Sequence, residues 1–129
     1  MSDNSFYLVV DDNPTDRTIA SILLKKCLNN PEVHLEEDSD NAIEWIRENR
    51  SSISKKLVIL LDMLMPNVDG FGFLEAYDRL DETSKSRSEI IMLSSMDEVS
   101  DFTFKAKNHP LVKCVLPKPL NIDVLKEVV

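Results

Sequence analysis

The chain has 129 residues, of which 43% are hydrophobic and 29% charged, and its formal net charge is −8 at pH 7. These values fit one globular domain with a substantial core, and the acidic balance argues against a nucleic-acid-binding surface, which needs a basic face. No apolar run approaches the roughly 20 residues of a membrane-spanning helix, and the polar start carries no recognisable secretion signal. We therefore expect a cytoplasmic protein without a membrane partner, in which Cys27 and Cys114 are buried reduced thiols.

The first half of the chain predicts two strand–helix units. A strand near residues 6–10 precedes a helix over 14–29, for which Asn13 is a good N-cap and Pro14 suits the first position. Helical spacing places four apolar side chains of this helix inward: Ile19, Ile22, Leu23 and Cys27. A second strand near 33–37 is followed by a helix over 40–50, capped by Ser39 or Asp40. Its expected buried residues are Ala42, Ile43 and Ile46.

The second half continues the alternation. A strand near residues 57–61 precedes a helix that begins near Asp69, and the segment 81–88 is predicted to be a charged loop. A fourth strand near 89–94 is followed by a helix that begins at Asp97, and a fifth near 111–116 by a helix that begins near Asn121. The expected inward residues of these three helices are Phe71, Leu74 and Tyr77; Val99, Phe102 and Ala106; and Ile122, Leu125 and Val129.

This alternation predicts an α/β protein with a single domain over residues 1–129. Four of the strand segments are short, apolar runs, as strands buried on both faces of a parallel sheet are, and they lie near residues 6–10, 57–61, 90–93 and 112–117. Five such units favour a doubly wound, three-layer (βα)5 sandwich. Periodicity does not give the strand order, but the flavodoxin-like order 2-1-3-4-5 is the commonest for a sheet of this size.

Polar side chains stand where the predicted strands end. Asp11 and Asp12 follow the first strand, Asp62 the third, Ser94 the fourth and Lys118 the fifth. The carboxyl ends of parallel strands line one edge of the sheet, where ligands bind. In the order 2-1-3-4-5 the first and third strands are neighbours, so the three carboxylates would share one crevice. They would need a cation there, and oxygen ligands favour a hard one such as Mg²⁺.

Four motifs of the chain, taken in order, resemble those of the response-regulator receiver domains of two-component signal transduction. The segment 9–13 is similar to their acidic pair and the segment 61–70 to their phosphoacceptor motif. The segment 92–95 is similar to their Ser/Thr switch and the segment 117–120 to their lysine–proline motif. Each likeness alone is weak, but the four together span the chain and are specific.

The resemblance implies a role for each of these residues. Asp62 would accept a phosphoryl group from a sensor histidine kinase or a histidine phosphotransfer protein. Asp11 and Asp12 would hold Mg²⁺, with Asp62 and the backbone carbonyl of Leu64 as further ligands. Lys118 would bind a phosphoryl oxygen. Ser94 would hydrogen-bond the phosphoryl group and move inward when it arrives. Such a domain is a switch that phosphorylates itself, and it does not turn over an external substrate.

Two other functions fit part of the pattern. A Mg²⁺-dependent phosphohydrolase of the haloacid-dehalogenase type also uses an aspartate at a strand end, but it wants a second aspartate two residues later, where this chain has Leu64. A pseudo-receiver binds partners without phosphorylation, but it typically lacks an acidic-pair residue, the acceptor or the lysine, and this chain has all of them.

Three further expectations concern details of the switch. The resemblance implies a cis Lys118–Pro119 peptide bond. Val115 occupies the position where many receivers carry an aromatic switch residue, so we expect signal transmission that needs no aromatic rotamer. Leu64 and Met96 would flank the path of the water that hydrolyses the phosphoryl group. Both are apolar, so we expect slow self-dephosphorylation.

Overall fold

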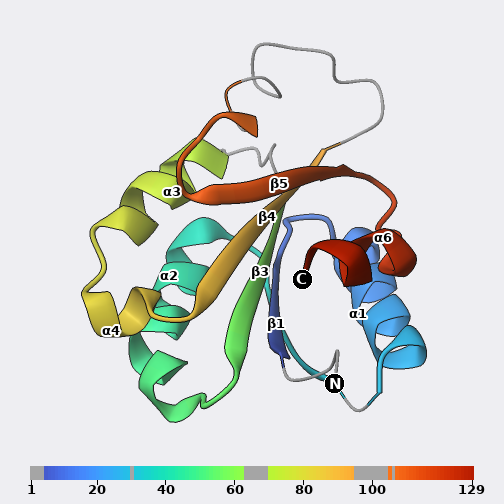
Figure 1. The fold of residues 1–129 in the computed structure, drawn as a ribbon, viewed down its shortest axis with the longest axis horizontal. Coiled ribbons are helices and arrows are strands. Elements are labelled where there is room, and N and C mark those ends of the chain that lie inside the picture. Colours follow the sequence, from blue (N-terminus) through green and yellow to red (C-terminus); the bar gives the residue numbers. More distant parts are fainter. Residues whose placement is uncertain (1–4, 30, 63–69, 95–104, 106) are drawn as a thin grey trace.

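A computed structural model of the chain describes residues 5–29, 31–62, 70–94, 105 and 107–129. They form a five-stranded parallel sheet in the order β2-β1-β3-β4-β5, with helices on both faces (Figure 1). The predicted fold class and strand order are therefore confirmed. The strands are β1 (Ser5–Val10), β2 (Glu32–Glu36), β3 (Lys56–Asp62), β4 (Ser88–Ser94) and β5 (Val112–Pro117).

Two helical layers enclose the sheet. Helices α1 (Pro14–Cys27) and α6 (Ile122–Val128) lie on one face, and α2 (Ser39–Asn49) and α3 (Gly70–Asp78) lie on the other (Figure 1). The 3₁₀ helix η1 (Arg50–Ser52) and the short helix α4 (Glu82–Lys85) connect elements at the opposite edge from the carboxyl ends of the strands. Among the described helices, none is both long enough and apolar enough to cross a membrane.

The central strand β3 is an uninterrupted apolar run from Leu57 to Leu61 because it is buried on both faces. Its odd-numbered residues Leu57, Ile59 and Leu61 enter the core beneath α2 and α3. Its even-numbered residues Val58 and Leu60 enter the core beneath α1 and α6. Because both faces are covered, no position of the strand benefits from a polar residue until the strand ends at Asp62.

The strand register brings the polar strand ends to one edge. Val10 of β1 pairs with Leu61 of β3. The residues that follow them, Asp11 and Asp62, therefore lie side by side at the carboxyl edge of the sheet. Ser94, the last residue of β4, pairs with Pro117 of β5, directly before Lys118. The sheet therefore places side chains from four separate segments side by side.

The predicted inward face of the first helix was wrong for Ile19, Ile22 and Cys27, which are exposed, while Leu23 is half-buried and packs against the core as predicted. The buried residues of this helix and its C-cap are Ala20, Leu24 and Leu28. Ile19 and Ile22 are 44% and 56% exposed. The helix also ends at Cys27, two residues earlier than predicted. Helical spacing allows two apolar faces for this helix, one with Ile19 and Ile22 and one with Ala20 and Leu24. The helix packs on the sheet with the second face, where Ala20 is small enough for close approach.

The cysteine prediction fails for one residue of the two. Cys27 is exposed, because the actual roll of α1 turns it away from the sheet, and Cys114 is half-buried. Both thiols are free, as expected. Burial raises the pKa of the Cys114 thiol above its ordinary value.

Several boundaries also differ from the predictions. The N-cap of α2 is Asp38, whose carboxylate accepts from the backbone N–H of Asn41, not Ser39 or Asp40. The predicted loop 81–88 contains α4, which Asp81 caps by accepting from the backbone N–H of Ser84. Phe71 of α3 is half-buried, while the expected inward residues of the second helix are buried as predicted: Ala42, Ile43 and Ile46. The helix predicted from Asp97 falls largely outside the described residues.

Candidate functional site

Three carboxylates meet at the carboxyl edge of the sheet. Asp11, Asp12 and Asp62 each offer an oxygen, and these oxygens all lie within 4.8 Å of one another. Asp11 is 3% exposed and Asp62 7% exposed, while Asp12 is half-buried. The predicted convergence of the three residues is confirmed. Like charges this close repel strongly when they are poorly hydrated, so the group needs positive charge nearby.

The turn between β1 and α1 holds Asp11 in place through several hydrogen bonds. Its backbone N–H donates to the carbonyl of Glu36 on β2 at 3.1 Å. Its side-chain Oδ1 accepts from the backbone N–H of Asn13 at 3.0 Å. The guanidinium of Arg17 donates to its backbone carbonyl at 2.8 Å. Asn13 then caps α1 by accepting from the backbone N–H groups of Thr15 and Asp16, as predicted for the cap.

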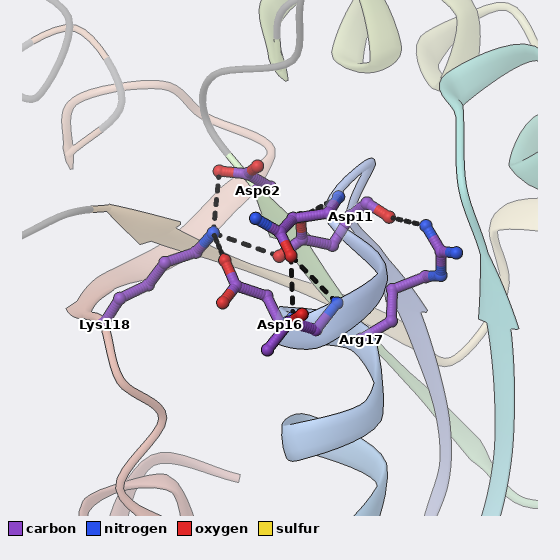
Figure 2. A network of polar contacts seen from close by, with 7 residues as sticks. Asp11, Asp16, Arg17, Asp62 and Lys118 are labelled. Carbon is purple, nitrogen blue, oxygen red and sulfur yellow. Dashed lines mark hydrogen bonds and ion pairs between the residues drawn. The ribbon is translucent and has the colours of Figure 1, made fainter.

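Lys118 supplies the positive charge. Its Nζ lies 3.0 Å from Oδ2 of Asp11, 3.2 Å from Oδ2 of Asp16 and 3.3 Å from Oδ1 of Asp62. Figure 2 shows the ammonium between these three side chains. Burial by itself lowers the pKa of Lys118, but the hydrogen bond to Asp11 and the negative charges of Asp62 and Asp11 outweigh it and hold the pKa above its ordinary value. The ammonium therefore stays protonated at neutral pH.

The backbone around Lys118 fixes its approach to the site. Its N–H donates to the carbonyl of Ser94 at 2.7 Å, which ties the end of β5 to the end of β4. The Lys118–Pro119 peptide bond is cis, as predicted. Ser94 is buried at the end of its strand, at the edge where the sequence placed it. Leu64, the remaining predicted metal ligand, lies outside the described residues, as do Ser95 and Met96.

Two residues of this site were not anticipated from the sequence. Asp16 contributes a fourth carboxylate, and Arg17 braces the backbone of Asp11. Both belong to the first turns of α1, which starts at this edge of the sheet. Their proximity to Asp11 and Asp12 in the sequence was a signal, but an acidic residue in a first helical turn is usually explained by the helix dipole.

The donor set fits a hard divalent cation. Asp11, Asp12 and Asp62 offer only oxygen atoms, and with Lys118 they carry three negative charges against one positive charge. Mg²⁺ is commonly bound through one or two carboxylates together with waters and a phosphate group. Such a cation, held beside the Lys118 ammonium, would make this edge able to receive a phosphoryl group.

A cavity of about 300 Å³ adjoins the site between α1 and the segment that follows β5. Its polar wall consists of Asp11, Asp16 and Lys118. Its apolar wall includes Ile19 and Leu120. Lys118 and Asp16 therefore line the cavity, and Lys118 also contacts Asp11 and Asp62 of the acidic group.

The family model for the response regulator receiver domain matches residues 7–129. Among curated proteins, the chain is 27% identical over 125 residues to the two-component response regulator ARR2 of Arabidopsis thaliana, covering 97% of this chain and 17% of that protein. It is 38% identical over 99 residues to a protein-glutamate methylesterase/protein-glutamine glutaminase of Agrobacterium fabrum, covering 74% of this chain and 24% of that protein. The chain thus spans less than a quarter of the length of these relatives.

Solved structures show the same similarity. A response regulator receiver protein from Dyadobacter fermentans superposes with a TM-score of 0.82 and 35% identity, covering 95% of this chain and 93% of that chain. A two-component response regulator from Cytophaga hutchinsonii has the same TM-score at 20% identity, covering 96% of this chain and 92% of that chain, which shows the shared fold.

Proposed function

The chain belongs to the response regulator receiver domain family, and from this premise we propose that it is a phosphorylation switch whose acceptor is Asp62. Receiver domains of two-component response regulators act in phosphorelay signalling. The observation that supports a phosphoryl site at Asp62 is its position: one of its oxygens lies 3.3 Å from the Lys118 ammonium, and its carboxylate belongs to the acidic group with Asp11 and Asp12. Asp11 lies as near to Lys118, so the choice of Asp62 as acceptor rests on the similarity of segment 61–70 to the phosphoacceptor motif of the family.

Phosphoryl transfer to a carboxylate is slow without help, because an anion must approach an anionic phosphoryl group. A bound Mg²⁺ held by Asp11, Asp12 and Asp62 supplies charge that offsets this repulsion. Lys118 adds a second positive charge, donates hydrogen bonds toward a phosphoryl oxygen and is held in position before the donor arrives. Ser94, at the end of β4, is the proposed hydroxyl donor to another phosphoryl oxygen.

Atoms and charge balance in the proposed chemical step. An oxygen of Asp62 forms a bond to phosphorus while the phosphorus–nitrogen bond of a phosphohistidine breaks. The electron pair of that bond stays with the imidazole of the donor, which takes up a proton. The product is an aspartyl phosphate, and Arg17 and Asn13 keep the neighbouring Asp11 in place throughout.

The proposed phosphodonor is a sensor histidine kinase or a histidine phosphotransfer protein, acting in the cytoplasm. In this proposal the chain is a switch that changes its partner-binding surface, and it turns over no external substrate. Neither a nucleic acid nor a membrane is part of it. Mg²⁺ is the proposed cofactor, with the backbone carbonyl of Leu64 as a further ligand.

Intact-mass spectrometry after treatment with acetyl phosphate tests the proposal. The parent chain with Mg²⁺ should gain one phosphate, and it should gain none in the presence of a chelator or as Asp62→Asn. Asp40→Asn, which removes an exposed first-turn carboxylate of α2, should be labelled like the parent. No labelling of the parent would favour a pseudo-receiver, and continuous release of phosphate from many donor molecules without a labelled chain would favour a phosphohydrolase.

A further inference from the structure

Asp16 contacts the Lys118 ammonium although it does not belong to the acidic group that could hold a cation. That group consists of Asp11, Asp12 and Asp62. Oδ2 of Asp16 lies 3.2 Å from Nζ of Lys118, between the distances of 3.0 Å to Asp11 and 3.3 Å to Asp62. The ammonium donates hydrogen bonds to Asp11 and Asp16 and forms an ion pair with Asp62.

The position of Asp16 in its helix does not by itself explain this contact. It is the third residue of α1, where an acidic side chain commonly folds back to accept from the N–H of the cap residue. Here the N–H of Asn13 donates to Asp11 instead. The carboxylate of Asp16 extends to Lys118, on a segment 102 residues away in the sequence (Figure 2).

Cation binding would change the partners of Lys118 unequally. A divalent ion on Asp11 and Asp62 takes up lone pairs and charge that otherwise attract the ammonium. Phosphorylation of Asp62 would further change how strongly Asp62 attracts the ammonium. Asp16 lies outside the acidic group of Asp11, Asp12 and Asp62, and its side chain is 41% exposed. The cation would therefore not compete with Lys118 for Asp16.

We propose that Asp16 is a positioning residue that holds Lys118 beside the acceptor while the cation occupies the acidic group. This inference rests on the proposed function and adds a residue to it. Asp16 draws the ammonium toward α1 and so lessens its competition with the cation for Asp11 and Asp62. Without Asp16, Lys118 pairs more closely with those two carboxylates, and the cation binds more weakly.

Calorimetric titration with Mg²⁺ in a double-mutant cycle tests this role without any measurement of phosphorylation. Asp16→Asn should weaken Mg²⁺ binding roughly fivefold, through the lost charge and through stronger competition by Lys118. In a Lys118→Met background only the lost charge remains, so the same substitution should weaken binding about twofold or less. Asp40→Asn, a matched first-turn change on α2, should leave affinity within about twofold of the parent.

Each outcome distinguishes the inference from the function on which it rests. Equal weakening by Asp16→Asn in both backgrounds, or no weakening in the parent, would overturn the positioning role while leaving the Mg²⁺ site intact. A parent chain that binds no Mg²⁺ would overturn the metal site and this inference together. Asp16→Ser serves as a second uncharged variant, and denaturation without Mg²⁺ confirms that each variant is folded.

Discussion

Nζ of Lys118 and Oδ2 of Asp11 lie 3.0 Å apart although 107 residues separate them in the sequence. The parallel sheet makes this contact possible, because the ends of β1 and β5 lie at the same edge. The hydrogen bond from the Lys118 backbone N–H to the Ser94 carbonyl fixes the position of Lys118 along that edge. The ammonium and the carboxylates are each costly to bury alone. Their mutual attraction offsets part of that cost at this edge of the sheet.

The acidic group should destabilise the protein when no cation is bound. Asp12→Asn removes one of three carboxylates whose oxygens lie within 4.8 Å of one another. Urea denaturation in chelator should show a free energy of unfolding about 1 kcal/mol above that of the parent, because like-charge repulsion is relieved. Added Mg²⁺ should stabilise the parent and barely affect the variant. An Asp12→Asn variant less stable than the parent in chelator would contradict the repulsion.

Arg50 should be important for stability at the opposite edge of the sheet. It is 5% exposed, and its guanidinium donates to the backbone carbonyls of Ser86, Arg87 and Ile53 at 2.6–3.1 Å. Arg50→Met removes the guanidinium hydrogen bonds to these carbonyls and should cost about 2–3 kcal/mol of unfolding free energy.

The matched control for Arg50 is Arg47, which lies in the last turn of α2, directly before η1. It forms an exposed ion pair with Glu44, so Arg47→Met should change the free energy of unfolding by about 0.5 kcal/mol or less. Equal costs for the two substitutions would show that the buried carbonyl contacts of Arg50 contribute nothing.

Glu89 should make stability depend on pH in the acidic range. Burial raises the pKa of this carboxyl, but the hydrogen bond from Lys113 and the ion pair with Lys56 outweigh burial and hold the pKa below its ordinary value. A lowered folded-state pKa contributes stability that is present above the unfolded-state pKa of about 4.3 and lost as pH falls through the folded-state pKa.

The measurement compares the parent with Glu89→Gln by urea denaturation. The stability difference should be constant from neutral pH down to about pH 5 and should shrink below about pH 4.3. Lys113→Met, which removes the 2.8 Å hydrogen bond to Glu89, should reduce this acid-dependent part. A difference that stays constant down to pH 3 would contradict the prediction.

Self-dephosphorylation should be slow for the reason anticipated from the sequence. Leu64 and Met96 are apolar, and neither side chain can orient a water in line with the Asp62–phosphorus bond. The decay of the phosphorylated chain in Mg²⁺, followed by intact mass, should be roughly tenfold faster or more for Leu64→Asn combined with Met96→Glu. A double variant that decays no faster than the parent would show that these positions do not limit access of water.

The parts of the site that the sequence predicted share one physical basis. Asp62 and Ser94 are the last residues of their strands and Asp11 and Lys118 directly follow theirs. A parallel sheet brings all such ends to one edge whatever the details of packing. Strand identity was readable because both faces of β3 are buried, which makes its sequence apolar throughout.

The parts that were missed depend on the roll of a helix and on individual side-chain contacts. Ile19 and Ala20 belong to competing apolar stripes, and local periodicity does not decide between them. Contacts with the rest of the fold, including the bond from Arg17 to Asp11, settle the orientation of α1. The reach of Asp16 to Lys118 depends on that orientation, so it could not be predicted from spacing alone.

Locating the phosphoryl group chemically tests the central claim most directly. Borohydride reduces an aspartyl phosphate to homoserine, so the parent chain is phosphorylated with acetyl phosphate and Mg²⁺, reduced, digested and analysed by peptide mass spectrometry. Homoserine should replace Asp62, and Asp11, Asp12 and Asp16 should remain aspartate. Homoserine at any of those three positions, or a phosphorylated chain without homoserine at position 62, would contradict the assignment of the acceptor.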